Sequence, residues 1–236
     1  MPTATFILVP GAGGSAWYWH LVEPELRQRG YDVVPVSLPA ADHNAGLAEY
    51  AAAVVRAIDN REPRDLVVVA QSLGGFTAPL VCKQVPVALL VLLNAMIPKP
   101  GERPGEWWTN TGHEEAKRQQ NERDGRPAEA PFDPLTDFFH DVPKSVIDEA
   151  LMQGEPRQSD TVFASRCTFT RWPVVPTRVL IGRDDRFFPA DFQRRIALER
   201  LGISADLMPG GHLAALSQPE ELAARLHAYV TEVRGA

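Results

Sequence analysis

The segment Leu66-Val-Val-Val-Ala70-Gln71-Ser72-Leu73-Gly74-Gly75 leads an apolar strand directly into a helix. Its turn has the pattern small-x-Ser-x-Gly, in which small residues let the backbone bend sharply. Such a turn holds the serine hydroxyl out above a sheet, and the helix N-terminus behind it favours developing negative charge. We therefore predict that Ser72 is a nucleophile. An ordinary strand–turn–helix with Ser72 as a cap is the alternative.

Apolar runs alternate with helix-like segments along the chain. The runs are rich in Val, Ile and Leu and lack polar alternation, which predicts strands buried on both faces of a sheet. The six expected strands are Thr5–Val9, Asp32–Ser37, Leu66–Ala70, Val87–Leu93, Thr177–Ile181 and Ser204–Met208. The expected helices are Trp19–Arg29, Leu47–Asn60, Leu73–Gln84, Asp191–Leu201 and a last helix with the capping box Ser217-Gln-Pro-Glu220.

Strand–helix–strand repetition predicts the α/β class, with a mostly parallel six-stranded sheet and helices on both faces. Pro35 has no N–H to donate, so its strand should lie at an edge.

Residues 95–175 interrupt the alternation, and they contain the pair Trp107-Trp108. Asp141–Met152 predicts an amphipathic helix. Its apolar face would carry Val146, Ile147, Ala150 and Leu151. Because long insertions in compact domains are usually functional, we expect a helical cap over a core of residues 1–94 and 176–236. A surface insertion without a fixed structure is the alternative.

The composition is ordinary for a globular protein, with 44% hydrophobic and 23% charged residues. The longest apolar run, Val87–Leu93, is too short for a membrane span, and we expect no signal peptide. The net charge of −6 argues against a nucleic-acid partner. Cys82 and Cys167 are too far apart for a metal motif, and we expect a cytoplasmic, bacterial protein without metal or cofactor.

A glycine-rich loop, Pro10-Gly11-Ala12-Gly13-Gly14-Ser15, follows the first expected strand. The backbone N–H groups of Ala12 and Leu73 would together form a two-donor oxyanion hole. The rival interpretation is a phosphate-binding loop. However, the loop lacks the Walker lysine, and the spacing G-x-G-x-x-G fails at Ala16 or Trp17.

Titratable residues follow two later strands. Gly182-Arg-Asp-Asp185 places carboxylates after the fifth expected strand, and Gly210-Gly-His212-Leu213 follows the sixth. Sites of open α/β sheets lie at these strand ends. We predict His212 as a general base and treat the other histidines as structural or surface residues. A place in the pocket lining is the alternative for His20 and His43.

The chain resembles an α/β-hydrolase over nearly its full length. Its opening, Phe6-Ile-Leu-Val-Pro-Gly-Ala-Gly-Gly-Ser-Ala-Trp-Tyr-Trp19, resembles the branch of plant methylesterases and hydroxynitrile lyases. The resemblance implies Ser72 as nucleophile, His212 as base and Asp185 as orienting acid, with Ala12 and Leu73 as oxyanion donors.

Asp185 fits the acid position better than Asp184, because it stands three residues after Gly182 and four before Pro189. The chain departs from the family at Pro10, where His is usual, and at Ala70, where Gly is usual.

These residues predict hydrolysis of a small carboxylic ester, lactone or thioester through an acyl-enzyme. We expect Trp107, Trp108 and Leu213 to contact an apolar part of the substrate. A lyase, a cofactor-free oxygenase or a ligand receptor could use the same residues. The lyases of the branch carry Thr in the loop and Lys after the histidine; here Gly11 and Leu213 stand there, which favours a hydrolase. The sequence does not decide between a monomer and a homodimer.

Overall fold

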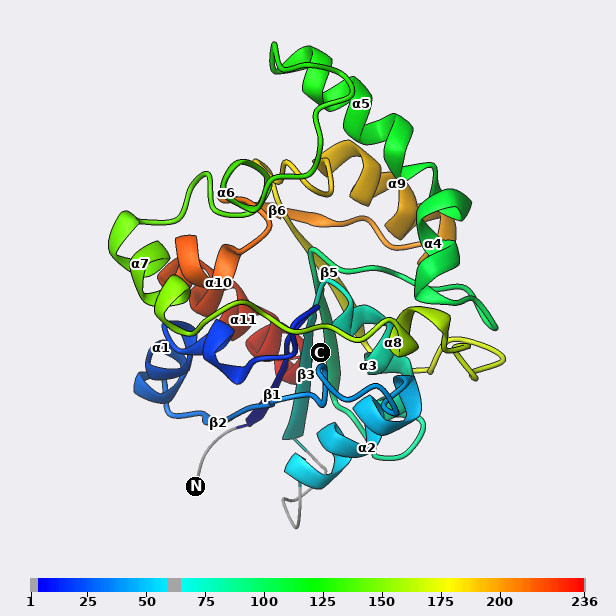
Figure 1. The fold of residues 1–236 in the computed structure, drawn as a ribbon. Helices are drawn as coiled ribbons and strands as arrows, with labels where there is room; N and C mark the ends of the chain where they lie inside the picture. The colour runs from blue at the N-terminus through cyan, green and yellow to red at the C-terminus, as the bar shows by residue number, and fades with distance from the viewer. Residues whose placement is uncertain (1–3, 59–64, 236) are drawn as a thin grey trace.

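The computed structural model describes residues 4–58 and 65–235 (Figure 1). Its centre is one six-stranded sheet in the order β2-β1-β3-β4-β5-β6, and every neighbouring pair is parallel. The strands are β1 (Thr5–Val9), β2 (Asp32–Pro35), β3 (Leu66–Gln71), β4 (Leu89–Leu93), β5 (Thr177–Gly182) and β6 (Asp206–Met208). The predicted α/β class and parallel sheet are confirmed.

Pro35 lies in the edge strand β2, opposite Leu8 of β1. The missing N–H of a proline costs no sheet hydrogen bond on the open side of an edge strand, which explains the order. The strands β3 and β4, in the middle of the sheet, are buried along their whole length.

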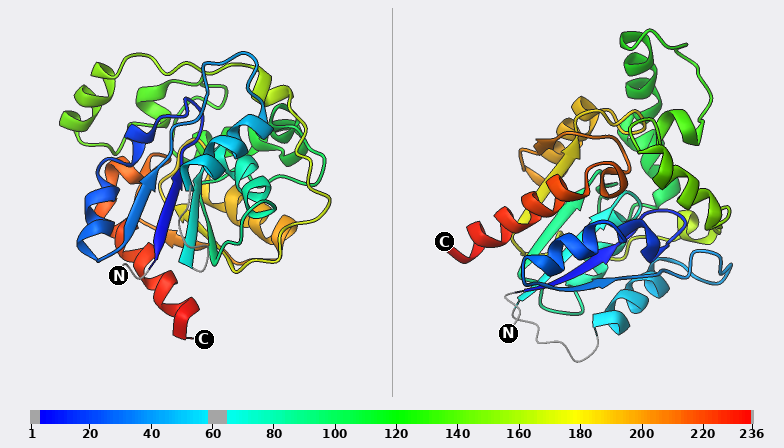
Figure 2. Two further views of the ribbon diagram at one scale, coloured as in Figure 1. Left: turned by 90° about the horizontal axis from the view of Figure 1, so that it is seen from below. Right: turned by 90° about the vertical axis from the view of Figure 1, so that its left-hand side faces the viewer.

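Helices cover both faces of the sheet (Figure 2). One face packs against α1 (Val22–Gln28), α10 (Ala214–Ser217) and α11 (Pro219–Gly235), and the other against α2 (Leu47–Ile58), α3 (Gly74–Cys82) and α9 (Ala190–Leu201). Successive side chains of a strand point to opposite faces. Accordingly, Phe6 and Leu8 belong to the core under α1 and α11, whereas Ile7 and Val9 belong to the other core.

Three expectations about helices were wrong. The segment Trp19–Arg29 divides into a 3₁₀ turn η1 (Ala16–Trp19) and α1. The capping box is not formed, because Ser217 ends α10 and its buried Oγ has no hydrogen-bond partner among the described residues. The apolar face of the helix α7 (Lys144–Met152) is narrower than expected, since Leu151 is 66% exposed. The expected end of the second helix at Asn60 lies outside the described residues.

The insertion between β4 and β5 is helical, as expected. It contains α4 (Pro104–Thr111), α5 (His113–Arg123), α6 (Pro134–Asp137), α7 (Lys144–Met152) and α8 (Thr161–Ala164). These helices gather beside the carboxyl ends of the strands (Figure 2). A buried ion pair between Glu102 and Arg200, 2.6 Å apart, ties the start of this cap to α9. No helix in the described part of the chain is long and apolar enough to cross a membrane.

Candidate active site

Ser72 lies in the turn between β3 and α3, and its backbone adopts a left-handed φ of 50°. This conformation is uncommon for a residue other than glycine and marks functional turns. The turn is tight, because a Cβ on Gly74 would lie 2.8 Å from the Pro10 carbonyl oxygen, and one on Gly75 would collide with the Met96 carbonyl. Gly74 of the sequence pattern and Gly75 directly after it are therefore both needed for the backbone to approach so closely.

Ser72, His212 and Asp185 form one hydrogen-bonded chain. The Oγ of Ser72 lies 3.1 Å from Nε2 of His212, and Nδ1 of His212 lies 2.9 Å from Oδ2 of Asp185. All three residues are buried, with exposed fractions of 8%, 1% and 3%. Because a carboxylate only accepts hydrogen bonds, the Nδ1–H donates to Asp185, and Nε2 is left to accept the serine proton.

Asp185 is held by the loop that follows it. Its Oδ1 accepts the backbone N–H groups of Phe187 and Phe188 at 2.9 and 2.8 Å. Its Oδ2 accepts the side chain of Gln193 at 3.2 Å in addition to His212. With both oxygens engaged, the carboxylate cannot turn away from the histidine.

The neighbouring Asp184 points elsewhere. It accepts the N–H of Gly210 at 3.1 Å and pairs with the exposed Arg183 at 3.2 Å. Asp184 therefore caps the loop before the histidine, and Asp185 is the aspartate that reaches His212.

Asn94, which the sequence analysis did not single out, is a buried link between three loops. Its backbone is left-handed, with φ of 43°. Its Oδ1 accepts the N–H of Gly182 at 2.7 Å, and its Nδ2 donates to the carbonyls of Gly211 and His212 at 3.0 and 3.2 Å. The available signal was a polar residue directly after the wholly apolar strand Leu89–Leu93. Gln193 had no comparable signal, because it lies within a helix.

The glycine-rich loop lies beside Ser72. A Cβ on Gly11 would lie 2.8 Å from the Ser72 Cβ, so this position has no room for a side chain. Within the described residues, the N–H groups of Ala12 and Leu73 donate to no acceptor. Gly13 donates its N–H to Oε1 of Gln158, which comes from the cap.

Aromatic rings enclose the histidine. Phe138 from the cap stacks on the His212 ring, with centroids 4.9 Å apart and planes at 14°. Phe187 and Phe188 lie edge-on at 5.1 and 4.9 Å. These rings make the surroundings of His212 apolar.

The two predicted cap tryptophans differ. Trp107 is 1% exposed, donates its Nε1–H to the Ile97 carbonyl and packs on Phe188. It therefore has no surface free for a substrate in this conformation. Trp108 is half-buried and packs 5.7 Å from Phe187. Substrate contact by Trp108 and by the half-buried Leu213 stays a prediction.

Other reactive side chains do not join the chain of three. His113 is buried in the cap and donates from Nε2 to the Phe187 carbonyl at 2.7 Å, and burial lowers its pKa. Burial raises the pKa of both Cys82 and Cys167 to about 12, so neither thiol is an effective nucleophile. In the part of the chain that the structure describes, no three His, Cys, Asp or Glu side chains are arranged to hold a metal ion.

Sequence and structure comparisons identify the family of the chain. The model of the alpha/beta hydrolase family matches residues 6–225, so the chain belongs to the α/β-hydrolase family. It is 24% identical to norfluorocurarine synthase 1 from a Strychnos species, over 92% of this chain and 91% of the relative. It is 22% identical to polyneuridine aldehyde esterase from Rauvolfia serpentina, over 92% of each chain. Among solved structures, the methylesterase MES16 from Arabidopsis superimposes with a TM-score of 0.73 and 19% identity, covering 97% of this chain and 99% of that one. The expected resemblance to the plant methylesterase branch is confirmed.

Proposed function

We propose that this protein is a serine hydrolase that cleaves a carboxylic ester, lactone or thioester through an acyl-enzyme. The observation that carries the proposal is the buried chain from Ser72 Oγ to His212 Nε2 (3.1 Å) and from His212 Nδ1 to Asp185 Oδ2 (2.9 Å). It combines a nucleophile, a base and an orienting carboxylate at the strand ends of an α/β-hydrolase.

The first half of the reaction forms the acyl-enzyme. His212 Nε2 takes the Ser72 proton while Oγ attacks the carbonyl carbon of the substrate. Asp185 keeps the imidazole in the correct tautomer and stabilises the imidazolium. The N–H groups of Ala12 and Leu73 bind the developing oxyanion, and loss of one such donor typically lowers the rate by about 100- to 1,000-fold.

The second half releases the product and restores Ser72. His212 gives its proton to the leaving alcohol or thiol when the tetrahedral intermediate collapses. It then takes a proton from the water that attacks the acyl carbonyl, and it returns this proton to Ser72 Oγ as the carboxylic acid leaves. No step needs a metal, an organic cofactor or a macromolecular partner.

The proposed substrate has an apolar acyl or alcohol group. Phe138, Phe187 and Phe188 surround the base with aromatic surface, and Trp108 continues that surface into the cap.

Trp108→Ala should change the ranking of p-nitrophenyl esters by acyl length. Trp172→Ala is the matched control, because this half-buried tryptophan packs on Phe169, outside the aromatic group around His212. An unchanged ranking in the Trp108 variant would remove it from the substrate site.

A fluorophosphonate label and an ester panel test the nucleophile. Wild-type protein should hydrolyse at least one p-nitrophenyl ester, and Ser72→Ala should lower kcat by several orders of magnitude with an unchanged melting temperature. The label should attach to Ser72 alone. An active Ser72→Ala protein, or labelling at another residue, would contradict the proposal. Stoichiometric ligand binding without turnover would instead favour the receptor alternative.

A further inference from the structure

Phe138 contacts His212 from a part of the cap in which residues 131–136 are exposed. It follows directly after α6, a helix of only four residues. The apolar side chains before it, Phe132 and Leu135, are 49% and 57% exposed. Phe138 instead lies flat on His212 and edge-on to Phe187, at a centroid distance of 4.8 Å. So short a helix does not hold its own shape, and something else must fix the place of this ring.

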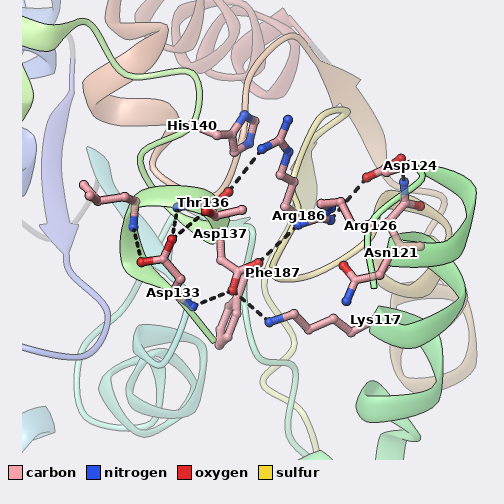
Figure 3. Close-up of polar contacts among 12 residues, drawn as sticks. Lys117, Asn121, Asp124, Arg126, Asp133, Thr136, Asp137, His140, Arg186 and Phe187 are labelled. Atoms are coloured by element: carbon pink, nitrogen blue, oxygen red, sulfur yellow. Dashed lines mark hydrogen bonds and ion pairs between the residues drawn. The ribbon is translucent and has the colours of Figure 1, made fainter. Parts of the chain in front are cut away.

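The residue before Phe138, Asp137, is buried and is fixed by two partly buried cations (Figure 3). Its side chain is 3% exposed, and its Oδ2 accepts Lys117 Nζ at 2.9 Å and the Asp133 N–H at 3.0 Å. Arg126 Nη1 lies 3.5 Å from Oδ1. We call Lys117, Arg126 and Asp137 the Asp137 cluster. It connects α5, the turn after α5 and α6, so it fixes α6 from two sides.

A largely desolvated ion cluster is a weak source of stability, because removing the charges from water offsets most of the attraction between them. Fixing one arrangement of the chain is the better-attested use of such groups. In this molecule the arrangement that the Asp137 cluster fixes is the one that puts the next residue, Phe138, on His212.

We infer that the Asp137 cluster positions Phe138 against His212, so that the cap controls the geometry of the catalytic base. The inference rests on the proposed function. The stack covers a face of the imidazole and leaves both ring nitrogens free for Ser72 and Asp185. The negative face of an aromatic ring attracts the imidazolium that forms when Ser72 loses its proton. Phe138 is thus a positioning residue, and Asp137 acts through it.

Four variants test this inference by kcat and KM on a small acetate ester. Phe138→Leu removes the ring at similar volume, and Asp137→Asn breaks the cluster but keeps the ring. Both should lower kcat about 10-fold and change KM little, as expected for the loss of one cation–π contact in the transition state. Phe138→Tyr should keep the wild-type kcat. Asp148→Asn, which breaks the exposed Lys144–Asp148 pair of the same cap, is the matched control and should have no effect.

The kcat of a double variant at Asp137 and Phe138 distinguishes positioning of the ring from a general loosening of the cap. The double variant Asp137→Asn/Phe138→Leu should be no slower than Phe138→Leu alone, because both changes remove the same stack. Additive losses, or a Phe138→Leu protein within twofold of wild type, would overturn the inference.

NMR of protein with labelled histidine gives a readout that does not depend on activity. The Phe138 ring current shifts the His212 ring protons, and Phe138→Leu abolishes this shift. Asp137→Asn should cause the same change although Phe138 is still present, whereas Asp148→Asn should not. Wild-type His212 signals in Asp137→Asn would overturn the inference. If the wild type shows no Ser72-dependent hydrolysis, the proposed function fails, and the NMR comparison still decides whether the cluster places the ring.

Discussion

The side-chain amide of Asn94 holds the backbone of His212: its Nδ2 lies 3.2 Å from the His212 carbonyl oxygen and 3.0 Å from that of Gly211. Its Oδ1 accepts the Gly182 N–H, which lies three residues before Asp185. One buried side chain at the end of β4 therefore links the loop that carries His212 to the loop that carries Asp185.

Replacing Asn94 with Gly should slow the reaction and destabilise the protein. Glycine suits the left-handed backbone at this position, so the change isolates the loss of the amide. A small displacement of His212 should lower kcat by up to about 100-fold. The buried Gly182 N–H and Gly211 carbonyl lose their partner, which should lower the free energy of unfolding by about 1–3 kcal/mol. Activity assays and urea denaturation measure the two effects.

The control for this prediction is Asn110→Ala. Asn110 donates to Glu102 at 2.9 Å in the cap and has no contact with the histidine loop. It should lose some stability but keep the wild-type kcat. Wild-type kcat in Asn94→Gly would show that Asn94 serves stability alone.

The adjacent aspartates Asp184 and Asp185 should respond very differently to replacement by Asn. Asp185→Asn puts an amide where Oδ1 accepts two backbone N–H groups and Oδ2 accepts the His212 Nδ1–H. The change favours the wrong tautomer of the histidine, and a loss of about 10⁴-fold in kcat is expected. Asp184→Asn removes only an exposed ion pair and weakens one contact to Gly210, so kcat should stay close to wild type. A severely slowed Asp184→Asn protein with an active Asp185→Asn protein would reverse the assignment.

His113 should make the stability of the protein sensitive to acid. Burial lowers its pKa from the ordinary value of 6.5, so below about pH 6.5 the unfolded chain binds a proton that folded His113 does not. The unfolded state then binds more protons, and the free energy of unfolding falls as the pH falls through 6.5, by at most about 1.4 kcal/mol per pH unit for this one group.

Urea denaturation between about pH 7.5 and 5 tests this behaviour. His113→Gln keeps a side-chain N–H for the Phe187 carbonyl and cannot titrate in this range, so its stability should depend less on pH than that of the wild type. His43→Gln, at an exposed histidine, is the control and should keep the wild-type slope. Equal slopes for the two variants would mean that His113 takes up its proton without unfolding.

Local sequence patterns predicted the sheet and the serine turn because short-range sterics determine both. Buried apolar runs specify the strands, and Gly74 and Gly75 are the residues that allow the chain to pass Pro10 and Met96. Pro35 marked the edge strand through the hydrogen bond that it cannot make.

Contacts between distant segments escaped the sequence analysis because no local pattern encodes them. Asn94 binds residues that lie 88 or more positions away in the sequence. Gln193 lies only eight positions from Asp185, but their contact forms across a loop. Phe138 meets His212 only after the cap has folded. At Ser217 a local pattern predicted a contact that the fold does not make. The sequence has a good capping box for the last helix, but Ser217 is the final residue of the short helix α10.

The last prediction is that the protein releases no cyanide from cyanohydrins by way of Ser72. The lyases that the chain resembles place Thr at the position of Gly11, but a Cβ there would lie 2.5 Å from Gln71 Oε1 and 2.8 Å from Ser72 Cβ. They also place Lys after the catalytic histidine, where this chain has Leu213, a half-buried residue packed into the apolar core. The two arginines of the neighbouring loop are engaged elsewhere, Arg183 with Asp184 and Arg186 with the Thr136 carbonyl (Figure 3). Without a cation beside the leaving group, cyanide loses the charge stabilisation that its departure requires.

With mandelonitrile and with acetone cyanohydrin, wild type and Ser72→Ala should therefore release cyanide at the same background rate, while only the wild type cleaves the ester panel. Ser72-dependent cyanide release faster than ester hydrolysis would contradict this prediction and make the protein a lyase.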